Sequence, residues 1–454
     1  MLKYTPFILA FTLCSCMVGP DYAPPSVELP ASWKAKTPPK QNEAELANWW
    51  KIFGDPQLNK LVDKALQNNP DLIIAFTRIR EARERVNISE ANLLPSADIR
   101  TGWGLSPTQG FRSSSIQNFS WNGNISWELD LFGGNRRSIE AAEASYLSTV
   151  ASACAVRTSL LADLATAYFS WITAKEQLRI AEEQLLVQKD TLTIAEKRYD
   201  AELSSKLDVQ QAISTVSSTE SKIPALKAQV QNTENQLAVL LGTYHANINL
   251  SMPSKTVYEK TPTIPTGLPS DLLRRRPDII SAEKKLHQAV ANIGVAVSDL
   301  YPKFSLTGAV SGKNKDFGEL FRENNSVWSL GGNLIQPLFQ GGALRANVRA
   351  QEAAAEAEAE SYRKALISAV SEVESALIDY GNYTSQMQYL HKTNNANKEA
   401  FLLSKKLYIN GETEFLNVIA AQRSWLSSEE ALVTMRQNIR KSVVQLARAL
   451  GGGW

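Results

Sequence analysis

The side chains that most often carry out chemistry are few and scattered in this sequence. Its three histidines, His245, His287 and His391, are too far apart to form a metal-ligand motif. The glycine pairs at 331–332 and 341–342 lack the Lys-Ser/Thr of a phosphate-binding loop, and no nucleophile elbow is present. We therefore expect no enzyme, no cofactor and no metal site.

Cys16 is the residue best placed for a covalent modification. Residues 1–15 carry a positive charge followed by a short apolar core, which is typical of a signal peptide. The stretch "LCSC" that ends at Cys16 resembles a bacterial lipobox, in which the cysteine is acylated and becomes the new N-terminus. Cys16 fits better than Cys14, because Leu13 is too large for the small position before the cysteine. The alternative is a secretory signal that happens to end in cysteine.

Two further features follow from an exported, acylated chain. Cys154 is the one other cysteine left after cleavage, so no disulfide framework is available. Residue 17 is methionine rather than aspartate, and for a lipoprotein the lipobox resemblance then implies sorting to the outer membrane. The proline-rich segment 16–40 is suited to be a lipidated, extended tether.

Composition limits the remaining possibilities. The 48 Lys and Arg residues nearly balance the 46 Asp and Glu residues, so no electrostatic argument points to nucleic acid. No apolar run approaches the roughly 20 residues of a membrane-spanning helix. If the chain spans a membrane, we expect it to do so with strands.

The sequence contains an internal duplication. Residues 69–95 resemble 276–302, and 198–212 resemble 407–421. The period is far longer than that of a solenoid repeat. We therefore divide the mature chain into a first structural repeat at 41–242, an equatorial linker at 243–270 and a second structural repeat at 271–454.

Each repeat follows the same order of helix, strand, strand, very long helix and returning helix. The span between glycines in the first repeat predicts one helix of roughly 100 Å, with a heptad seam that calls for packing against neighbouring helices. The expected elements are a helix at 71–94, strands at about 96–105, 119–132, 303–311 and 328–339, long helices at about 135–200 and 342–409, and return helices at about 206–241 and 414–450.

The strand predicted at 119–132 has one apolar and one polar row. Phe119 and the two tryptophans occupy the apolar row, which we expect to face lipid. The polar row holds four residues that we expect to face an aqueous lumen: Asn122, Asn124, Glu128 and Asp130. The two acids either favour cations weakly or only hydrate the wall.

Four strands cannot close a barrel, and unpaired edges are not tolerated in lipid. Closure must therefore come from several copies of the chain. Two copies give eight strands, whose interior is filled by side chains, whereas three give twelve strands, which leave room for a lumen. The pattern itself does not fix the number of copies.

The far ends of the long helices are predicted to be tight helical hairpins. Ser205 and Asp208 form a capping-box pattern at the start of one return helix. Gly411 supplies a helix stop, and Thr413 is expected to be the N-cap of the other return helix.

Five motifs, taken in order together with the duplication, resemble the outer membrane factors of tripartite efflux systems, in the lipoprotein branch typified by the OprM and NodT proteins and related to TolC. These are "GPDY" after the lipobox, "NWWKIFGDPQLNKLVDKAL" at 48–66, "RRRPDI" at 274–279, "PLFQGG" at 337–342 and "AQRSW" at 421–425. The resemblance covers essentially all of residues 14–454.

The resemblance implies an α+β membrane protein. It is expected to be a homotrimer whose twelve-stranded outer-membrane β-barrel, four strands per chain, continues as a long periplasmic α-helical barrel. An equatorial belt would take 41–66, the linker 243–270 and the C-terminus. The family partners are a periplasmic adaptor protein, an inner-membrane efflux transporter and outer-membrane lipids. The chain would be a passive exit duct that needs no cofactor.

The resemblance also assigns the hairpin ends, 198–208 and 407–417, to closing the tunnel and meeting the adaptor. The residues expected to take part are Arg198, Tyr199, Asp208, Tyr408, Asn417 and Arg423. Arg423 matches an arginine that joins gate-closing contacts in the family, but the acidic residue often found three positions earlier is Ala420 here. The alternative is that these charges are solvated helix ends.

Other functional readings remain open from the sequence. Drugs, detergents, metal ions or fatty acids could be exported, and the channel could serve a type I secretion or metal-ion efflux system. A coiled-coil lipoprotein that tethers two layers of the envelope is a structural alternative. A barrel enzyme would need a nucleophile and base inside the strands, where only Ser, Asn, Glu and Asp are available.

Overall fold

The computed structural model describes residues 17–26, 30–34, 46–107, 115–247, 249–259, 262, 271, 275–322 and 326–454. The expected signal peptide, Cys16 and much of the 243–270 linker lie outside these residues. The chain forms two compact units: Met1–Val27, Thr77–Ala151 and Ser281–Lys364 make the first, and Glu28–Phe76, Ser152–Ile280 and Ala365–Trp454 make the second. Both units draw on both sequence repeats, so the units and the repeats are different divisions of the chain.

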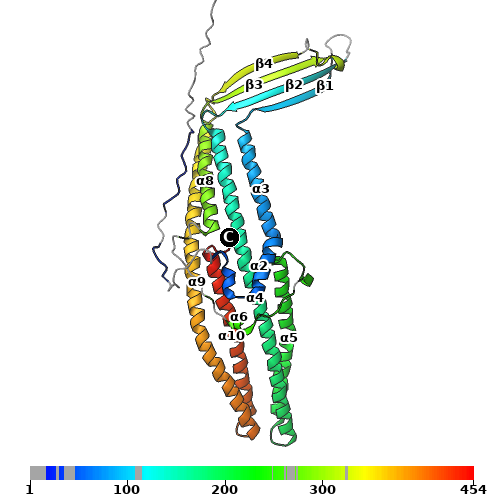
Figure 1. Cartoon of the computed structure of the whole chain (residues 1–454), viewed down its shortest axis with the longest axis vertical. Helices are drawn as coiled ribbons and strands as arrows, with labels where there is room; N and C mark the ends of the chain where they lie inside the picture. Colours follow the sequence, from blue (N-terminus) through cyan, green and yellow to red (C-terminus); the bar gives the residue numbers. More distant parts are fainter. Residues whose placement is uncertain are drawn as a thin grey trace, which may run out of the picture. The chain divides into compact units, whose positions relative to one another are not determined.

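The first unit contains one antiparallel four-stranded sheet in the order β1-β2-β3-β4 (Figure 1). Its strands are β1 (Ser96–Pro107), β2 (Ser115–Leu129), β3 (Lys303–Asn314) and β4 (Ser326–Ile335). The central β2–β3 ladder joins a strand of one sequence repeat to a strand of the other, from Phe119↔Asn314 to Leu129↔Phe304. The strands β1 and β4 are the two edges.

Two strands, β2 and β4, end earlier than the sequence predicts, each for an identifiable reason. β2 ends at Leu129 instead of 132, because the next residue, Asp130, binds the start of the following helix. β4 ends at Ile335 instead of 339, and Leu338 is therefore not part of the strand. Pro337 has no N–H to donate to the ladder, which accounts for the early end.

The register confirms that the apolar rows of all four strands share one face. Trp121 lies opposite Thr101 and Gly312, and Trp127 lies opposite Leu306. On β4, Leu330 lies opposite Gly308 on the same face. Several large side chains of this face are well exposed in the single chain, among them Ile99 at 77%, Trp103 at 61%, Trp328 at 78% and Leu330 at 79%.

Part of the apolar face is covered by the chain itself. The 3-10 helix η4 (Phe317–Glu319) and the residues after it lie over β2. The Phe119 ring lies 5.5 Å from the Phe317 ring, and the Trp121 ring lies 5.8 Å from the Phe321 ring. The β3–β4 connection therefore covers part of Phe119 and Trp121, which are half-buried in the single chain, and the expectation that they face lipid stays a prediction.

Long helices make up most of both units. Their bounds are α3 Pro70–Ala91, α4 Gly134–Asp200, α5 Lys206–Leu240, α8 Pro277–Ser298, α9 Ala343–Asn410 and α10 Phe415–Ala449. Shorter elements are η1 Trp49–Phe53, α2 Pro56–Asn68, η2 His245–Asn247 and α6 Lys255–Glu259. Within the second unit, α5 runs beside α4 and α10 beside α9 (Figure 1).

The "NWWKIFGDPQL" motif forms part of the core of the second unit. Trp49, Trp50 and Phe53 of η1 are buried, and the Phe53 ring contacts the Phe169 ring of α4 at 4.6 Å. Asp55 caps α2 by accepting from the N–H of Gln57 at 2.8 Å. The same carboxylate accepts the hydroxyl of buried Tyr168 at 2.7 Å. The motif thus anchors a short helix to a long one.

Among the described residues, one helix is long and apolar enough to cross a membrane by length and composition. It is α4, and half of the 18-residue window that qualifies is buried inside the protein. The sequence prediction that no apolar run approaches the length of a membrane-spanning helix is therefore corrected for α4, by length and composition. Seam residues Leu164, Trp171 and Ala174 are almost fully buried, which is the behaviour of a core helix.

Candidate functional site

The first candidate site lies where the two helical hairpins of the second unit turn. α4 ends at Asp200, and α5 begins at Lys206 with Ser205 as N-cap. The Ser205 Oγ accepts from the N–H of Asp208 at 3.4 Å and donates to its Oδ1 at 2.9 Å. The predicted cap at this turn is therefore present.

The second turn differs from its prediction. α9 ends at Asn410, and Gly411 takes the left-handed conformation expected of a helix stop, with φ of 79°. The N-cap of α10 is Glu414, without a side-chain bond, and not Thr413. The Thr413 hydroxyl instead accepts from the Asn417 Nδ2 at 2.9 Å, which uses the oxygen that a cap would need.

Three of the predicted residues meet between these turns. The Arg198 Nη1 donates to the Ile409 carbonyl at 2.7 Å, and its guanidinium lies 4.8 Å from the centre of the Tyr408 ring. The Tyr408 hydroxyl donates to the Asp208 Oδ2 at 3.2 Å. Ile409 lies in the last turn of α9, where free carbonyls favour a cation. Arg198 and Tyr408 thus connect the two hairpins.

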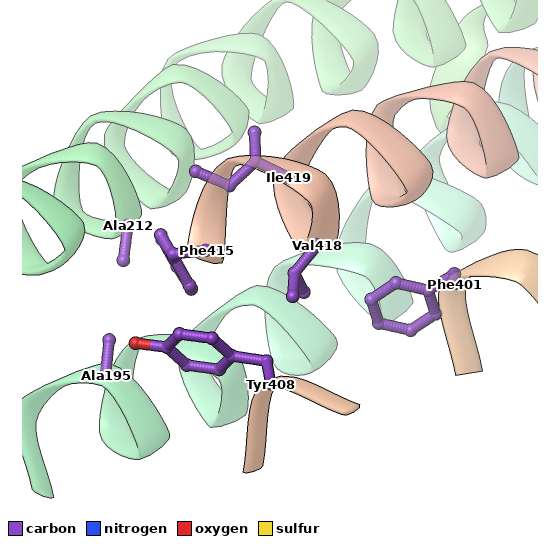
Figure 2. Packing of buried hydrophobic residues seen from close by; sticks show 7 residues of the cluster. All are labelled: Ala195, Ala212, Phe401, Tyr408, Phe415, Val418 and Ile419. Carbon is purple, nitrogen blue, oxygen red and sulfur yellow. The ribbon is translucent and has the colours of Figure 1, made fainter. Parts of the chain in front are cut away.

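Tyr408 also belongs to a buried apolar cluster drawn from all four helices (Figure 2). Its neighbours there are Ala195, Ala212, Phe401, Phe415, Val418 and Ile419. The Tyr408 side chain is 3% exposed. Burial raises the pKa of its hydroxyl, so the group remains a neutral hydrogen-bond donor towards Asp208.

The other predicted residues of the hairpin ends do not join this group. Tyr199 is 42% exposed. Arg423 is exposed on α10 and makes no hydrogen bond or ion pair within the part of the chain that the structure describes. Any gate contact of Arg423 must therefore come from outside the described residues of this chain.

Two further contacts between helices at this end of the second unit were not predicted from the sequence. The Phe401 ring of α9 stacks on the Trp425 ring of α10 at 5.3 Å. Lys405 of α9 pairs with Asp190 of α4 at 2.5 Å. Trp425 belongs to the quoted "AQRSW" motif, which was a usable signal. The ion pair joins residues far apart in the sequence and left no local pattern.

The second candidate site is the polar face of the sheet. The register places Asn122, Asn124 and Glu128 on the face opposite the apolar row. The Asn124 Nδ2 donates to Asp98 at 3.3 Å, and the same Asp98 carboxylate pairs with Arg100 at 2.9 Å. The Asp98–Arg100 pair was not predicted, although both residues occupy even positions of the β1 pattern.

Asp130 has a different role from the one expected. It follows the last residue of β2, and its carboxylate accepts from the N–H groups of Asn135 at 3.1 Å and Arg136 at 3.0 Å. The Arg136 Nε also pairs with it at 3.1 Å. The prediction that Asp130 lies on the strand is wrong, because the exposed N–H groups of the α4 N-terminus take its oxygens.

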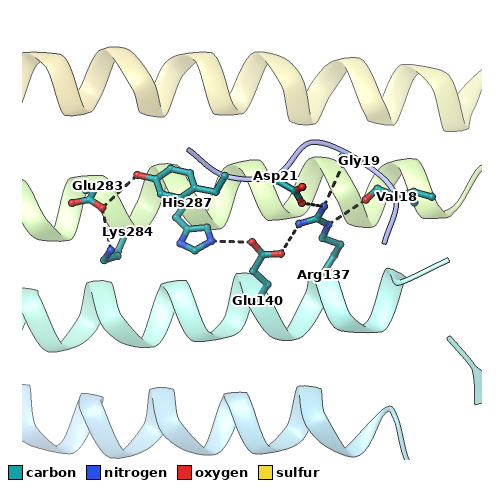
Figure 3. Close-up of polar contacts among 9 residues, drawn as sticks. Val18, Gly19, Asp21, Arg137, Glu140, Glu283, Lys284 and His287 are labelled. Atoms are coloured by element: carbon teal, nitrogen blue, oxygen red, sulfur yellow. Dashed lines mark hydrogen bonds and ion pairs between the residues drawn. The ribbon is translucent and has the colours of Figure 1, made fainter. Parts of the chain in front are cut away.

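The third candidate site is the N-terminal strap, which we define as residues 17–22. The Arg137 side chain of α4, 2% exposed, pairs with Asp21 at 2.7 Å and with Glu140 at 2.7 Å (Figure 3). It also donates to the carbonyls of Val18 at 3.2 Å and Gly19 at 3.4 Å. One buried guanidinium therefore holds the strap through both backbone and side chain.

Two more contacts extend the strap along α8. The Tyr22 ring stacks on the His287 ring at 4.2 Å, and His287 contacts Glu140 at 2.9 Å. Gly19 has a φ of 88°, and a Cβ there would lie 2.5 Å from the Cα of Gly294. The "GPDY" motif thus combines a glycine for close approach, an acid for Arg137 and an aromatic ring for stacking.

Comparison with known proteins identifies the family. The outer membrane efflux protein family matches residues 61–243 and 268–452. The chain belongs to the outer membrane efflux protein family. The two matched segments correspond to the two halves of the duplication, so the expected family and its two-fold repeat are confirmed.

Named efflux proteins resemble the chain over its whole length. It is 32% identical over 465 residues to the solvent efflux pump outer membrane protein SrpC of Pseudomonas putida, covering 100% of this chain and 98% of that protein. It is 29% identical over 455 residues to the cation efflux system protein CusC of Escherichia coli O6:H1, covering 100% and 99%. The solved outer-membrane channel OprN has 31% identity and a TM-score of 0.87, covering 97% of this chain and 100% of that one.

This efflux protein is therefore an outer-membrane channel component of an efflux system, as expected from its motifs. A duct works by geometry and by opening, not by a reacting group. In the described residues, no group of three or more His, Cys, Asp or Glu side chains is arranged to hold a metal ion.

Proposed function

We propose that three copies of this efflux protein form the outer-membrane exit duct of a tripartite pump. The observation that carries the proposal is the sheet, which has a wide apolar face and two edge strands, β1 and β4, within one chain. Lipid accepts the apolar face but not the unpaired edges, so each edge must pair with another copy. Three copies give twelve strands, which is wide enough for a lumen.

Native mass spectrometry of the detergent-purified protein tests the assembly. The expected species contains three chains and dissociates to single chains on heating in SDS. Stable monomers or dimers that retain native helix and strand content would contradict the twelve-stranded barrel.

We further propose that an inner-membrane transporter and a periplasmic adaptor deliver small toxic molecules, such as drugs or solvents, to the duct. The similarity to SrpC, a solvent efflux protein, supports this substrate class. The similarity to CusC makes cation efflux the second candidate. The two are distinguished by deleting the gene, restoring it, and comparing tolerance to a hydrophobic drug, an organic solvent and a heavy-metal salt. Restored tolerance to the metal salt alone would favour the second candidate.

The hairpin turns are proposed to be the resting gate and the adaptor contact. Support comes from the Arg198 bond to Ile409 and from the Tyr408 bond to Asp208, which hold the two hairpins of one chain together. Opening requires the hairpins to separate, so these contacts favour the closed state. Tyr199, Asn417 and Arg423 are proposed to contact other copies or the adaptor.

Acylation of Cys16 is proposed to anchor the protein beside the barrel. The strap begins one residue later, and the Val18 N–H donates to the Phe132 carbonyl at 3.2 Å, close to the end of β2. A lipid on Cys16 would therefore enter the membrane near the sheet. Mass spectrometry of the N-terminal peptide tests this, and an unmodified Cys16 in protein purified from membranes would contradict it.

A further inference from the structure

A small polar cavity in the second unit lies outside every site described above. Its volume is about 250 Å3, and its walls come from α6, α9 and α10. The lining residues that matter here are Tyr258, Glu259, His391, Arg436 and Arg440. Two arginines one helical turn apart give this cavity a positive wall.

Arg440 is a buried cation that forms no ion pair with a carboxylate of the described residues. Its residue is 5% exposed, and its guanidinium donates to the Tyr258 carbonyl. The guanidinium lies 4.6 Å from the Tyr258 ring centre and 5.5 Å from that of Phe169. Burial lowers the pKa of Arg440, and the nearby charge of Arg436 lowers it further. A buried charge of this kind is costly unless an anion pairs with it.

No carboxylate among the described residues lies close enough to form an ion pair with these arginines. Neither Arg436 nor Arg440 makes an ion pair within the residues that the structure describes. Glu259 lines the cavity and pairs with Lys255 at 3.9 Å. Glu176 is paired with Arg179, and Asp55, which accepts from the neutral Tyr168 hydroxyl, acts on Arg440 only at longer range, without an ion pair.

Two more observations point to an oxygen-rich ligand. Tyr258 is 8% exposed, and its hydroxyl has no hydrogen-bond partner among the described residues. The Arg436 guanidinium lies 5.1 Å from the centre of the same ring. The chain that continues from Glu259, residues 260–270, contains a lysine and no acid, so it cannot neutralise the arginines.

We propose that this cavity binds a small oxyanion of the phosphate class. Arg436 and Arg440 supply the charge, and the Tyr258 hydroxyl supplies a further donor. Guanidinium groups match the geometry of phosphate oxygens, and hydrogen bonds to an ionised acceptor are the strong ones. The volume suits a free anion with a few waters and not a whole phospholipid. The bound anion would link α6 to α10 and stabilise the native protein by mass action.

Equilibrium dialysis with radiolabelled inorganic phosphate tests the proposal on the intact, detergent-purified protein. Chloride keeps the ionic strength constant, so only specific binding is scored. We expect saturable binding of one phosphate per chain. Arg436→Gln should weaken it by about tenfold or more, because one charge-assisted contact is lost. Arg363→Gln, which removes an exposed arginine of α9, is the matched control and should leave the affinity unchanged.

Arg440→Gln risks the fold, so Tyr258→Phe is the second variant. It removes only the unpaired hydroxyl and should also weaken phosphate binding. Wild-type affinity in both Arg436→Gln and Tyr258→Phe would overturn the proposal, as would the absence of saturable binding in the wild type. Phosphatidylglycerol micelles should not displace phosphate, and displacement would overturn the assignment to a free anion.

Discussion

Replacing Arg198 by alanine should open the resting channel. The Arg198 side chain connects the first hairpin to the second through the Ile409 carbonyl and the Tyr408 ring. Its other bond, to the Leu203 carbonyl at 3.2 Å, stays within the first hairpin and does not resist separation. The relevant loss is therefore one charged hydrogen bond and one cation–π contact.

The size of the effect follows from these two contacts. A hydrogen bond from a charged donor contributes about 1.5 kcal/mol at the lower end of its range, which is appropriate to this partly exposed site. A cation–π contact near the surface adds about 0.5 kcal/mol. A loss of about 2 kcal/mol from the closed state alone raises the ratio of open to closed channels about 30-fold.

Planar-bilayer recording of the purified protein measures this ratio directly as the fraction of time spent open. Arg179→Ala is the matched control, because Arg179 lies on the same helix and, among the described residues, forms its ion pairs with Glu176 and Glu183 of that helix. We expect a large increase for Arg198→Ala and little change for Arg179→Ala. Equal open fractions in the two variants would refute the role of Arg198 as a tie between hairpins.

Three further predictions concern single side chains. Arg423→Glu should raise the conductance of the resting channel through lost contacts between copies, and an unchanged closed state would count against a gate role. Asp130→Asn should cost about 1–2 kcal/mol by weakening the cap of α4, seen as a lower thermal unfolding midpoint. Burial raises the pKa of Glu140, but Arg137 and His287 lower it more, so the net pKa is lowered. The stability that Glu140 contributes is present above about pH 4.3 and is lost as pH falls through the lowered pKa. Glu140→Gln should therefore make thermal stability less dependent on pH below about pH 4.3.

Local periodicity was sufficient to predict the strands and long helices. A period of two placed the apolar rows of all four strands on one face, because side chains alternate with no dependence on distant contacts. Helix ends were predicted to within a few residues where glycine or a capping serine marked them. Thr413 is not the N-cap, because its hydroxyl accepts a hydrogen bond from the Asn417 side chain instead. The sequence does not indicate which of these two hydrogen bonds forms.

The sequence did not predict features that depend on distant segments. The residues that pack over Trp121 belong to the β3–β4 connection, whose sequence is mostly polar and predicts a loop. Phe317 and Phe321, four residues apart in this connection, supply the rings. The bond from Arg198 to Ile409 joins residues 211 positions apart. Both residues lie in the predicted hairpin ends, 198–208 and 407–417, but only the structure shows that they are in contact.

Single-channel conductance of the purified, trimeric protein in a planar bilayer tests the central claim most directly. We expect discrete openings from a channel that is mostly closed at rest and opens more often in Arg198→Ala. A folded trimer that inserts into the bilayer and never conducts, in either form, would contradict its role as an exit duct.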